Sequence, residues 1–309
     1  ITFVRHRVGQ KGDLVVLQGT MTTRIEWGGP LDITRAGYEY LKHAPAPKEP
    51  TQERLRYFVK YLEFPDEIVA SDAYGEFANA PYEDIVALQE DFPRERLRQW
   101  ITSPDVPPTR LGLYGLMLGL CGGQDDAILM RDIITKETDE YRLGIDGVVA
   151  GYLLLTGEEG LDVIDQTKLD NKDAAFSETY AGMQALRFMW TYGGGRIRPE
   201  RLQESMRGLL DRPELADLVI ADLARWKDWS IQDRLMDMYG AEEFDIATIK
   251  RAIIRYMIAA TRDKPKAEDG SAGPVSTRPH VAKAETLLEE LREKDPQTVR
   301  QAERFYFPR

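Results

Sequence analysis

The residues in this sequence that are best suited to chemistry are carboxylates, and they are concentrated between Tyr61 and Pro93. That stretch has no lysine or arginine, and its acidic residues are Glu63, Asp66, Glu67, Asp72, Glu76, Glu83, Asp84, Glu90 and Asp91. Asp72 and Glu76 are four positions apart, so a helix would present them on one face. Two carboxylates about 5–9.5 Å apart can act as acid and base, or as nucleophile, in glycoside hydrolysis. One hypothesis is therefore an all-α hydrolase with a carboxylate pair in a concave face.

The same carboxylates also have a structural explanation. Several of them would fall in the first turns of helices, where a negative charge interacts favourably with the helix dipole by about 0.3–1 kcal/mol. This interpretation makes the stretch one unit of a stack of helices, with an acidic surface as a by-product. The acidic trend continues in "DEYRLGID" and "EEGLDVID". The candidate partner-binding residues are Asp72, Glu76, Asp132 and Asp165.

The chain has few of the residues that other catalytic sites and metal sites require. The three histidines, His6, His43 and His280, are far apart, and the single cysteine, Cys121, lies in the apolar stretch "LGLYGLMLGLCGG". There we expect it to be a small buried hydrophobe. The sequence contains no H-E-x-x-H, G-x-x-x-x-G-K-[ST] or G-x-S-x-G motif and no EF-hand loop. We predict no metal and no cofactor.

Composition and charge narrow the class of partner. The chain has 309 residues, of which 42% are hydrophobic and 30% charged, and a formal net charge of −11. Nucleic-acid binding needs clustered lysine and arginine, so this charge argues against it and favours a protein or peptide partner, in particular a basic one. The longest apolar run, "GVVAGYLLLTG", is shorter than the roughly 18–20 residues that span a bilayer. We therefore expect no membrane span.

The elements that must position these residues begin with β structure. In "ITFVRHRVGQKGDLVVLQGTMTTRIEW", apolar residues alternate at period two, and "GQKGD" predicts a turn between two strands. The apolar face of this hairpin would consist of Val15, Leu17, Met21, Ile25 and Trp27. Gly19 is a candidate bulge. A hairpin alone is marginal in water, so it should pack on a helix. We assign residues 1–30 to the hairpin and 31–309 to a helical domain.

After "GGP" the apolar period becomes 3.6, which indicates helices. Prolines open many of the segments and glycines close others. Gly115 and Gly119 would let a neighbouring helix approach closely. The loop 261–280 is rich in Pro, Gly, Ser and charge and is predicted to be flexible. The sixteen predicted helices are 33–43, 51–64, 66–80, 82–91, 94–102, 109–121, 124–136, 145–156, 158–167, 175–192, 198–211, 213–227, 229–239, 246–261, 281–294 and 296–306.

Helix pairs begin near residues 51, 82, 109, 145, 175, 213 and 246, a period that is typical of stacked helical repeats. The segments "FPDEIVASDAYGEFANA" and "RPELADLVIADLARWKDWS" resemble the second helix of HEAT-like repeats, although Ala70 stands where those repeats usually have arginine. The matching positions in the first segment are Pro65, Asp66, Val69, Ala73 and Phe77. The chain also looks like uncharacterised bacterial proteins, often exported, that join a short β segment to such repeats.

The resemblance implies an all-α fold, a curved α-solenoid of about seven helix pairs with a small N-terminal β-hairpin. It transfers no catalytic residue. We expect a non-enzymatic scaffold that binds a protein or peptide. The alternatives are the hydrolase described above and a self-associating structural protein. The chain begins at Ile1 without an initiator methionine, which favours, as an expectation, an exported protein whose N-terminal segment has been removed, with a cytoplasmic location as the alternative.

Overall fold

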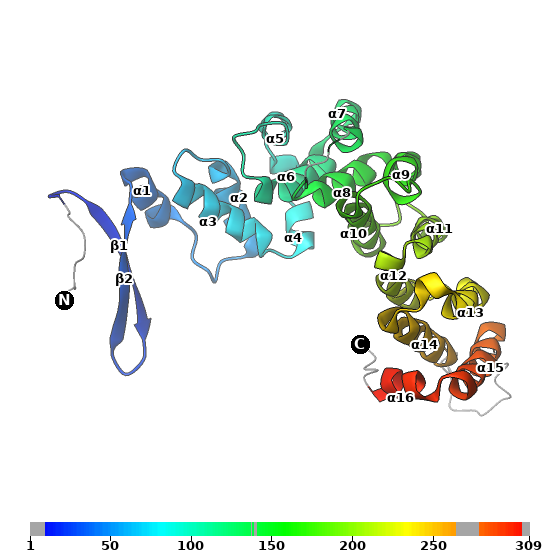
Figure 1. Cartoon of the computed structure of the whole chain (residues 1–309). Coiled ribbons are helices and arrows are strands. Elements are labelled where there is room, and N and C mark those ends of the chain that lie inside the picture. Colours follow the sequence, from blue (N-terminus) through cyan, green and yellow to red (C-terminus); the bar gives the residue numbers. More distant parts are fainter. Residues whose placement is uncertain (1–9, 137, 139–140, 264–277, 305–309) are drawn as a thin grey trace, which may run out of the picture.

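The computed structural model describes residues 10–136, 138, 141–263 and 278–304. The chain is mainly α-helical, with a small antiparallel sheet near its N-terminus. Figure 1 shows the helices following one another in chain order along an elongated row, with the sheet at one end. Within the described residues there are sixteen α-helices, as the sequence predicts. The greater part of the predicted loop, residues 264–277, lies outside the described residues.

The sheet is a β-hairpin, but its connecting turn differs from the predicted one. Strand β1 (Leu14–Met21) pairs antiparallel with β2 (Ile25–Ile33) around a turn closed by the N–H of Thr22 donating to the carbonyl of Arg24, at 3.1 Å. The predicted turn in "GQKGD" lies before β1, where Gly12 adopts a φ of +105°, and the strand predicted ahead of it lies outside the described residues. The observed turn contains no glycine or proline, so its composition did not predict a turn at this position.

The two faces of the hairpin have different surroundings. The predicted apolar face, which includes Val15, Met21, Ile25 and Trp27, is exposed to solvent. The opposite face, with Leu31 and its neighbours, is the one directed toward the first helices. The strand register shifts between Leu17 and Gly19, where a bulge is predicted, but the extra residue lies on β2, because two steps from Leu17 to Gly19 face three from Pro30 to Trp27.

All sixteen predicted helices have counterparts, mostly within two or three residues of the expected bounds, although several predicted helices end in short 3₁₀ or π turns. The turns used below are η2 (Gln89–Asp91) and the π-helical η3 (Asp165–Leu169). The helices are α1 (Arg35–His43), α2 (Thr51–Phe58), α3 (Glu67–Ala78), α4 (Tyr82–Val86), α5 (Arg94–Trp100), α6 (Pro108–Cys121), α7 (Gln124–Thr135), α8 (Ile145–Thr156), α9 (Glu158–Ile164), α10 (Phe176–Tyr192), α11 (Pro199–Gly208), α12 (Pro213–Arg225), α13 (Gln232–Gly240), α14 (Ala247–Thr261), α15 (Pro279–Lys294) and α16 (Pro296–Arg304).

The helix boundaries follow from local chemistry. Proline occupies the first turn of α6, α11, α12 and α15, where a missing N–H removes no intrahelical hydrogen bond. The carboxylate of Asp66 caps α3 by accepting from the N–H groups of Ile68 and Val69. Gly157, with a φ of +62°, separates α8 from α9 in a conformation that other residues rarely adopt.

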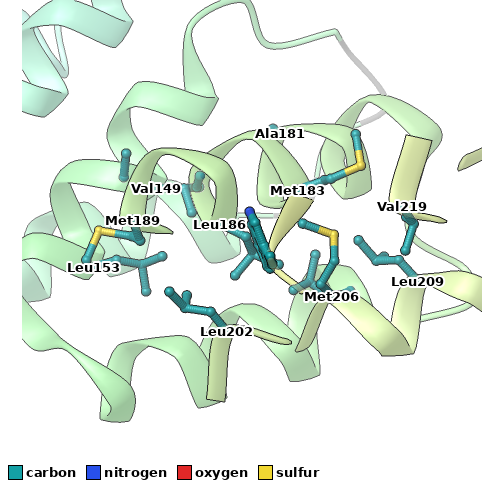
Figure 2. Packing of buried hydrophobic residues seen from close by; sticks show 14 of the residues in the cluster. Val149, Leu153, Ala181, Met183, Leu186, Met189, Leu202, Met206, Leu209 and Val219 are labelled. Atoms are coloured by element: carbon teal, nitrogen blue, oxygen red, sulfur yellow. The ribbon is translucent and has the colours of Figure 1, made fainter. Parts of the chain in front are cut away.

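The apolar core extends along the whole row. One continuous cluster of buried residues runs from Tyr40 in α1 to Ala302 in α16. Figure 2 shows a section of it, with Leu153 of α8, Leu186 of α10 and Met206 of α11 among the labelled members of the cluster. The extensive helix–helix contacts join helices that are one or two places apart in the chain, such as α6 with α8 and α12 with α14. Each pair of helices therefore buries its apolar side against the next pair.

The close approach of α6 to α8 confirms the prediction from Gly115 and Gly119 of α6. A β-carbon on Gly115 would lie 2.7 Å from the Cα of Val148 in α8, and one on Gly119 would collide with the backbone of Gly151. Real β-carbons do not come this close to backbone atoms. Glycine at these positions therefore lets α6 and α8 pack backbone against backbone.

Side-chain hydrogen bonds between carboxylates and donors about one helix pair away add a second link along the row. In many of these bonds the donor and the acceptor are 32 to 36 residues apart in the chain. Examples are Tyr40–Asp72, Arg94–Asp126, Arg142–Glu178, Arg187–Asp222 and Lys227–Asp263. Many acidic residues of this chain thus tie consecutive helix pairs together.

Candidate functional site

The structure does not bring the four predicted partner-binding residues into one site. Asp72 and Glu76 are one turn apart on α3, Asp132 is on α7, and Asp165 is in η3, directly after α9. Figure 1 shows that α5 and α6 lie between α3 and these later elements. Asp72 and Asp132 are exposed, whereas Glu76 and Asp165 are partly buried.

The two partly buried residues have internal partners. Glu76 forms an ion pair with Arg54 of α2. Asp165 forms an ion pair with Arg201 and accepts a hydrogen bond from the Ser205 hydroxyl at 3.0 Å, which joins η3 to α11. Burial is the largest effect on Asp165 and raises the pKa of its carboxyl in spite of these donors. These contacts stabilise the stack of helices, and a partner-binding role for the two residues stays a prediction.

Asp72 has a different setting, at the edge of a cavity. Its Oδ2 accepts a hydrogen bond from the hydroxyl of Tyr40, at 2.6 Å, and the Tyr40 side chain is buried. Burial raises the pKa of Tyr40, and the hydrogen bond to Asp72 raises it further. The phenol therefore stays protonated and acts as the donor, which orients the Asp72 carboxylate.

The cavity next to Asp72 lies between the hairpin, α1 and α3, and we call it the hairpin groove. Its volume is about 500 Å³, a size that is typical of binding pockets. Leu31 of β2, Leu41 of α1 and Ile68 of α3 contribute apolar walls and are 53%, 46% and 47% exposed. The residues that line the groove are Val16, Gly29, Leu31, Ile33, Gly37, Tyr40, Leu41, Asp66, Ile68, Val69 and Asp72.

A second carboxylate lies in the wall of the groove. Asp66 accepts a hydrogen bond from the Thr34 hydroxyl at 2.5 Å in addition to capping α3. The Thr34 hydrogen bond is the main reason why the pKa of Asp66 falls below its ordinary value, and the two backbone N–H groups add to it against the effect of burial. The groove therefore combines solvent-accessible apolar side chains with two acidic ones. Such a surface can bind an apolar side chain that has a cationic neighbour.

The sequence reasoning selected Asp72 but missed the rest of the groove. Its apolar members come from β2, α1 and α3, and each looks like an ordinary core position in its own segment. The one available signal was the hairpin, because a two-stranded sheet is marginal unless something packs on it. The sequence did not show which face of the hairpin packs toward the helices, because that depends on how the hairpin docks on α1 and α3.

A buried charged cluster at the end of α7 has a structural explanation. Lys168 donates to the carbonyl of Ile134 at 3.1 Å, Arg142 donates to the carbonyl of Ile133 at 2.6 Å, and both pair with Glu178. Burial lowers the pKa of Lys168 against the opposing effect of Glu178. The last carbonyls of a helix have no partner within the helix, and cations are favourable there. A cavity of about 400 Å³ lies beside this cluster.

Three further features of the described residues are the absence of a metal-binding group, the state of the Cys121 thiol and the length of the apolar helices. The described part of the chain holds no group of three or more His, Cys, Asp or Glu residues that could bind a metal ion. Cys121 is partly buried, and burial raises the pKa of its thiol to about 11, so the thiol is protonated at neutral pH. Over the same described residues, no helix has the length and apolar character needed to cross a bilayer.

Comparison of the chain with protein-family models, curated proteins and solved structures finds no match. The resemblance to HEAT-like repeats therefore stays a prediction from the sequence.

Proposed function

We propose that this protein is a non-enzymatic scaffold that binds an extended segment of another protein in the hairpin groove. The observation that carries this proposal is the groove itself, where Leu31, Leu41 and Ile68 are about half exposed beside Asp66 and Asp72. Exposed apolar side chains that gather around a concavity mark interaction sites more often than scattered ones do.

The proposed partner segment has a large apolar side chain next to a lysine or arginine. The apolar side chain would enter the groove, where burial contributes roughly 25 cal/mol per Å². The cation would pair with Asp72, whose carboxylate is exposed and is oriented by Tyr40. An exposed ion pair contributes only about 0–1 kcal/mol, so it sets the preference for a basic partner more than the affinity. The acidic net charge of −11 favours the same partner.

We further propose that the row of helices is a curved, HEAT-like solenoid of about seven pairs that holds the groove at one end of a long surface. The contacts between successive helix pairs and the carboxylate hydrogen bonds at intervals of 32 to 36 residues support this architecture. In such an array each repeat contacts only its neighbours, so an extended face stays available for additional contacts with the partner.

Peptide binding tests the proposal. Two fluorescent peptides of ten residues would be compared by anisotropy, one alternating leucine with lysine and one alternating leucine with glutamate. We expect the lysine peptide to bind more tightly, and its affinity to fall as salt rises. Asp72→Asn should weaken its binding about two- to fivefold, the effect of one exposed ion pair. Asp132→Asn is the matched control, because it removes the same charge from an exposed position on α7.

A second variant tests the apolar part of the groove. Leu31→Ser removes an apolar wall of the groove and should reduce the binding of both peptides about tenfold. Complete burial of a leucine side chain contributes roughly 1.5–3 kcal/mol, and a bound peptide would bury only part of Leu31. Equal binding of both peptides, or equal effects of Asp72→Asn and Asp132→Asn, would contradict the proposed site. Sedimentation of the chain alone distinguishes the alternative, because a self-associating protein would form oligomers without any peptide.

A further inference from the structure

An aromatic contact joins helices α4 and α10, which are six places apart in chain order. The ring of Tyr82, the first residue of α4, packs edge-on against Phe188 of α10, with centroids 5.2 Å apart and an interplanar angle of 90°. It also contacts Tyr192, at 4.8 Å, and Phe188 contacts Tyr192 in turn, at 5.4 Å. Edge-on and tilted geometries of this kind are favourable for aromatic rings. The three rings join residues about one hundred positions apart.

This contact closes a cycle of packed elements. The 3₁₀ turn η2 (Gln89–Asp91) follows α4 and packs on α6, α6 packs on α8, and α8 packs on α10. Tyr82 then links α10 back to α4. In an open row, small shifts at successive interfaces add up, so the position of α4 relative to α10 depends on three of them. A direct link between the two ends of the cycle removes that freedom.

The link is firmly held at one end and accessible at the other. Tyr82 follows Pro81, and the next turns of the same segment are anchored by Ile85 and Leu88, which are buried. Tyr192, by contrast, is 43% exposed. Phe188 packs against the core, whereas Tyr82 is only partly buried. The Tyr82 ring can therefore leave the contact while Ile85 and Leu88 stay buried.

We propose that Tyr82, Phe188 and Tyr192 form an aromatic strap that holds the part of the row from α4 to α10 in one shape, and that its release lets α4 move away from α10. The strap is independent of the hairpin groove and of the function proposed for it. Its role is conformational, because it selects one member of a set of shapes that the open row could adopt.

Pulsed electron paramagnetic resonance measures the distance that the strap controls. Spin labels would be attached to cysteines in place of Glu53 on α2 and Glu204 on α11, both exposed, in a Cys121→Ser background. The parent protein should give one narrow distance distribution. With Tyr82→Ala we expect a broader distribution with a longer mean, and about a tenfold larger population outside the parent range, the effect of losing two aromatic pairs.

Three further variants make the result decisive. Tyr192→Ala should broaden the distribution in the same way from the α10 side, and Tyr82→Phe should keep the parent distribution because it keeps the ring. Tyr141→Ala is the matched control, since that side chain is 72% exposed. An unchanged distribution in Tyr82→Ala would overturn the proposal. A loss of helical circular dichroism in either alanine variant would also overturn it, because the rings would then support the helices themselves.

Discussion

At the contact between α6 and α8, Gly115 and Gly151 leave no room for a β-carbon, whereas at the hairpin Met21 and Leu31 are 73% and 53% exposed. Both regions are rich in apolar residues, but the middle of the row uses them for its own packing and the N-terminal end leaves them open to solvent. Helix α8 is buried along nearly its whole length, while all but the last residue of β2 is exposed. Apolar content alone therefore does not distinguish a buried core from a solvent-exposed surface in this chain.

The largest expected effect comes from matched leucine truncations in the two regions. Leu153 of α8 is fully buried, so Leu153→Ala should lower the free energy of unfolding by about 2–5 kcal/mol. Leu31→Ala at the groove should change it by less than about 0.5 kcal/mol. Urea denaturation followed by circular dichroism gives both values. Similar losses for the two variants would mean that the hairpin belongs to the same core as α8.

Glycine substitutions test the same contrast at the level of the backbone. A β-carbon at Gly151 would collide with the carbonyl of Gly115, so Gly151→Ala should destabilise the protein by about 1–3 kcal/mol. The control is Gly75→Ala, in the interior of α3, where the added carbon meets no atom within 4 Å. That variant should stabilise the protein by about 0.5–1 kcal/mol through helix propensity. Thermal unfolding of the two variants should therefore shift in opposite directions, and a stabilised Gly151→Ala protein would show that α6 and α8 can separate.

At the C-terminal end of the row, we expect the charge of Asp263 to make a smaller, pH-dependent contribution to the free energy of unfolding. Asp263 accepts hydrogen bonds from Lys227, Trp229 and Arg278, which ties α15 to the ends of α12 and α14. Burial raises the pKa of Asp263, but these donors and their charges outweigh it and lower the pKa to about 2. A lowered carboxyl pKa stabilises the fold above its ordinary value of about 4, and this stabilisation is lost as pH falls toward 2.

Asp263→Asn should therefore reduce the free energy of unfolding by about 1–2 kcal/mol at pH 7, and the difference from the parent protein should shrink between pH 4 and pH 2. Asp132→Asn, at an exposed position, serves as the control and should leave the profile of the parent protein nearly unchanged. The measurement is urea denaturation across this pH range. A difference that stays constant from pH 7 to pH 2 would show that the Asp263 charge does not hold α15 in place.

Much of the fold could be predicted because its signals are local. The apolar period of 3.6 residues, together with proline and glycine at the ends, placed all sixteen helices, and Gly115 and Gly119 indicated the close contact that α8 makes. The prediction failed at the hairpin turn, where Thr22 and Arg24 close a turn without the residues that usually mark one. Of the four residues predicted to bind a partner, Asp72 lines the hairpin groove, and its partner-binding role stays a prediction.

Local residue patterns specify the set of helices, many of their boundaries and the acidic, mainly helical character of the chain, since each of these depends on residues within a few positions of one another. Long-range packing, in contrast, pairs Glu76 and Asp165 internally, places Asp72 at the border of an apolar groove and brings Tyr82 into contact with α10. These outcomes depend on how segments about thirty to one hundred residues apart dock together. That docking determines which side chains are buried together and which share a hydrogen-bond partner. The spacing of residues within one segment does not predict how distant segments dock.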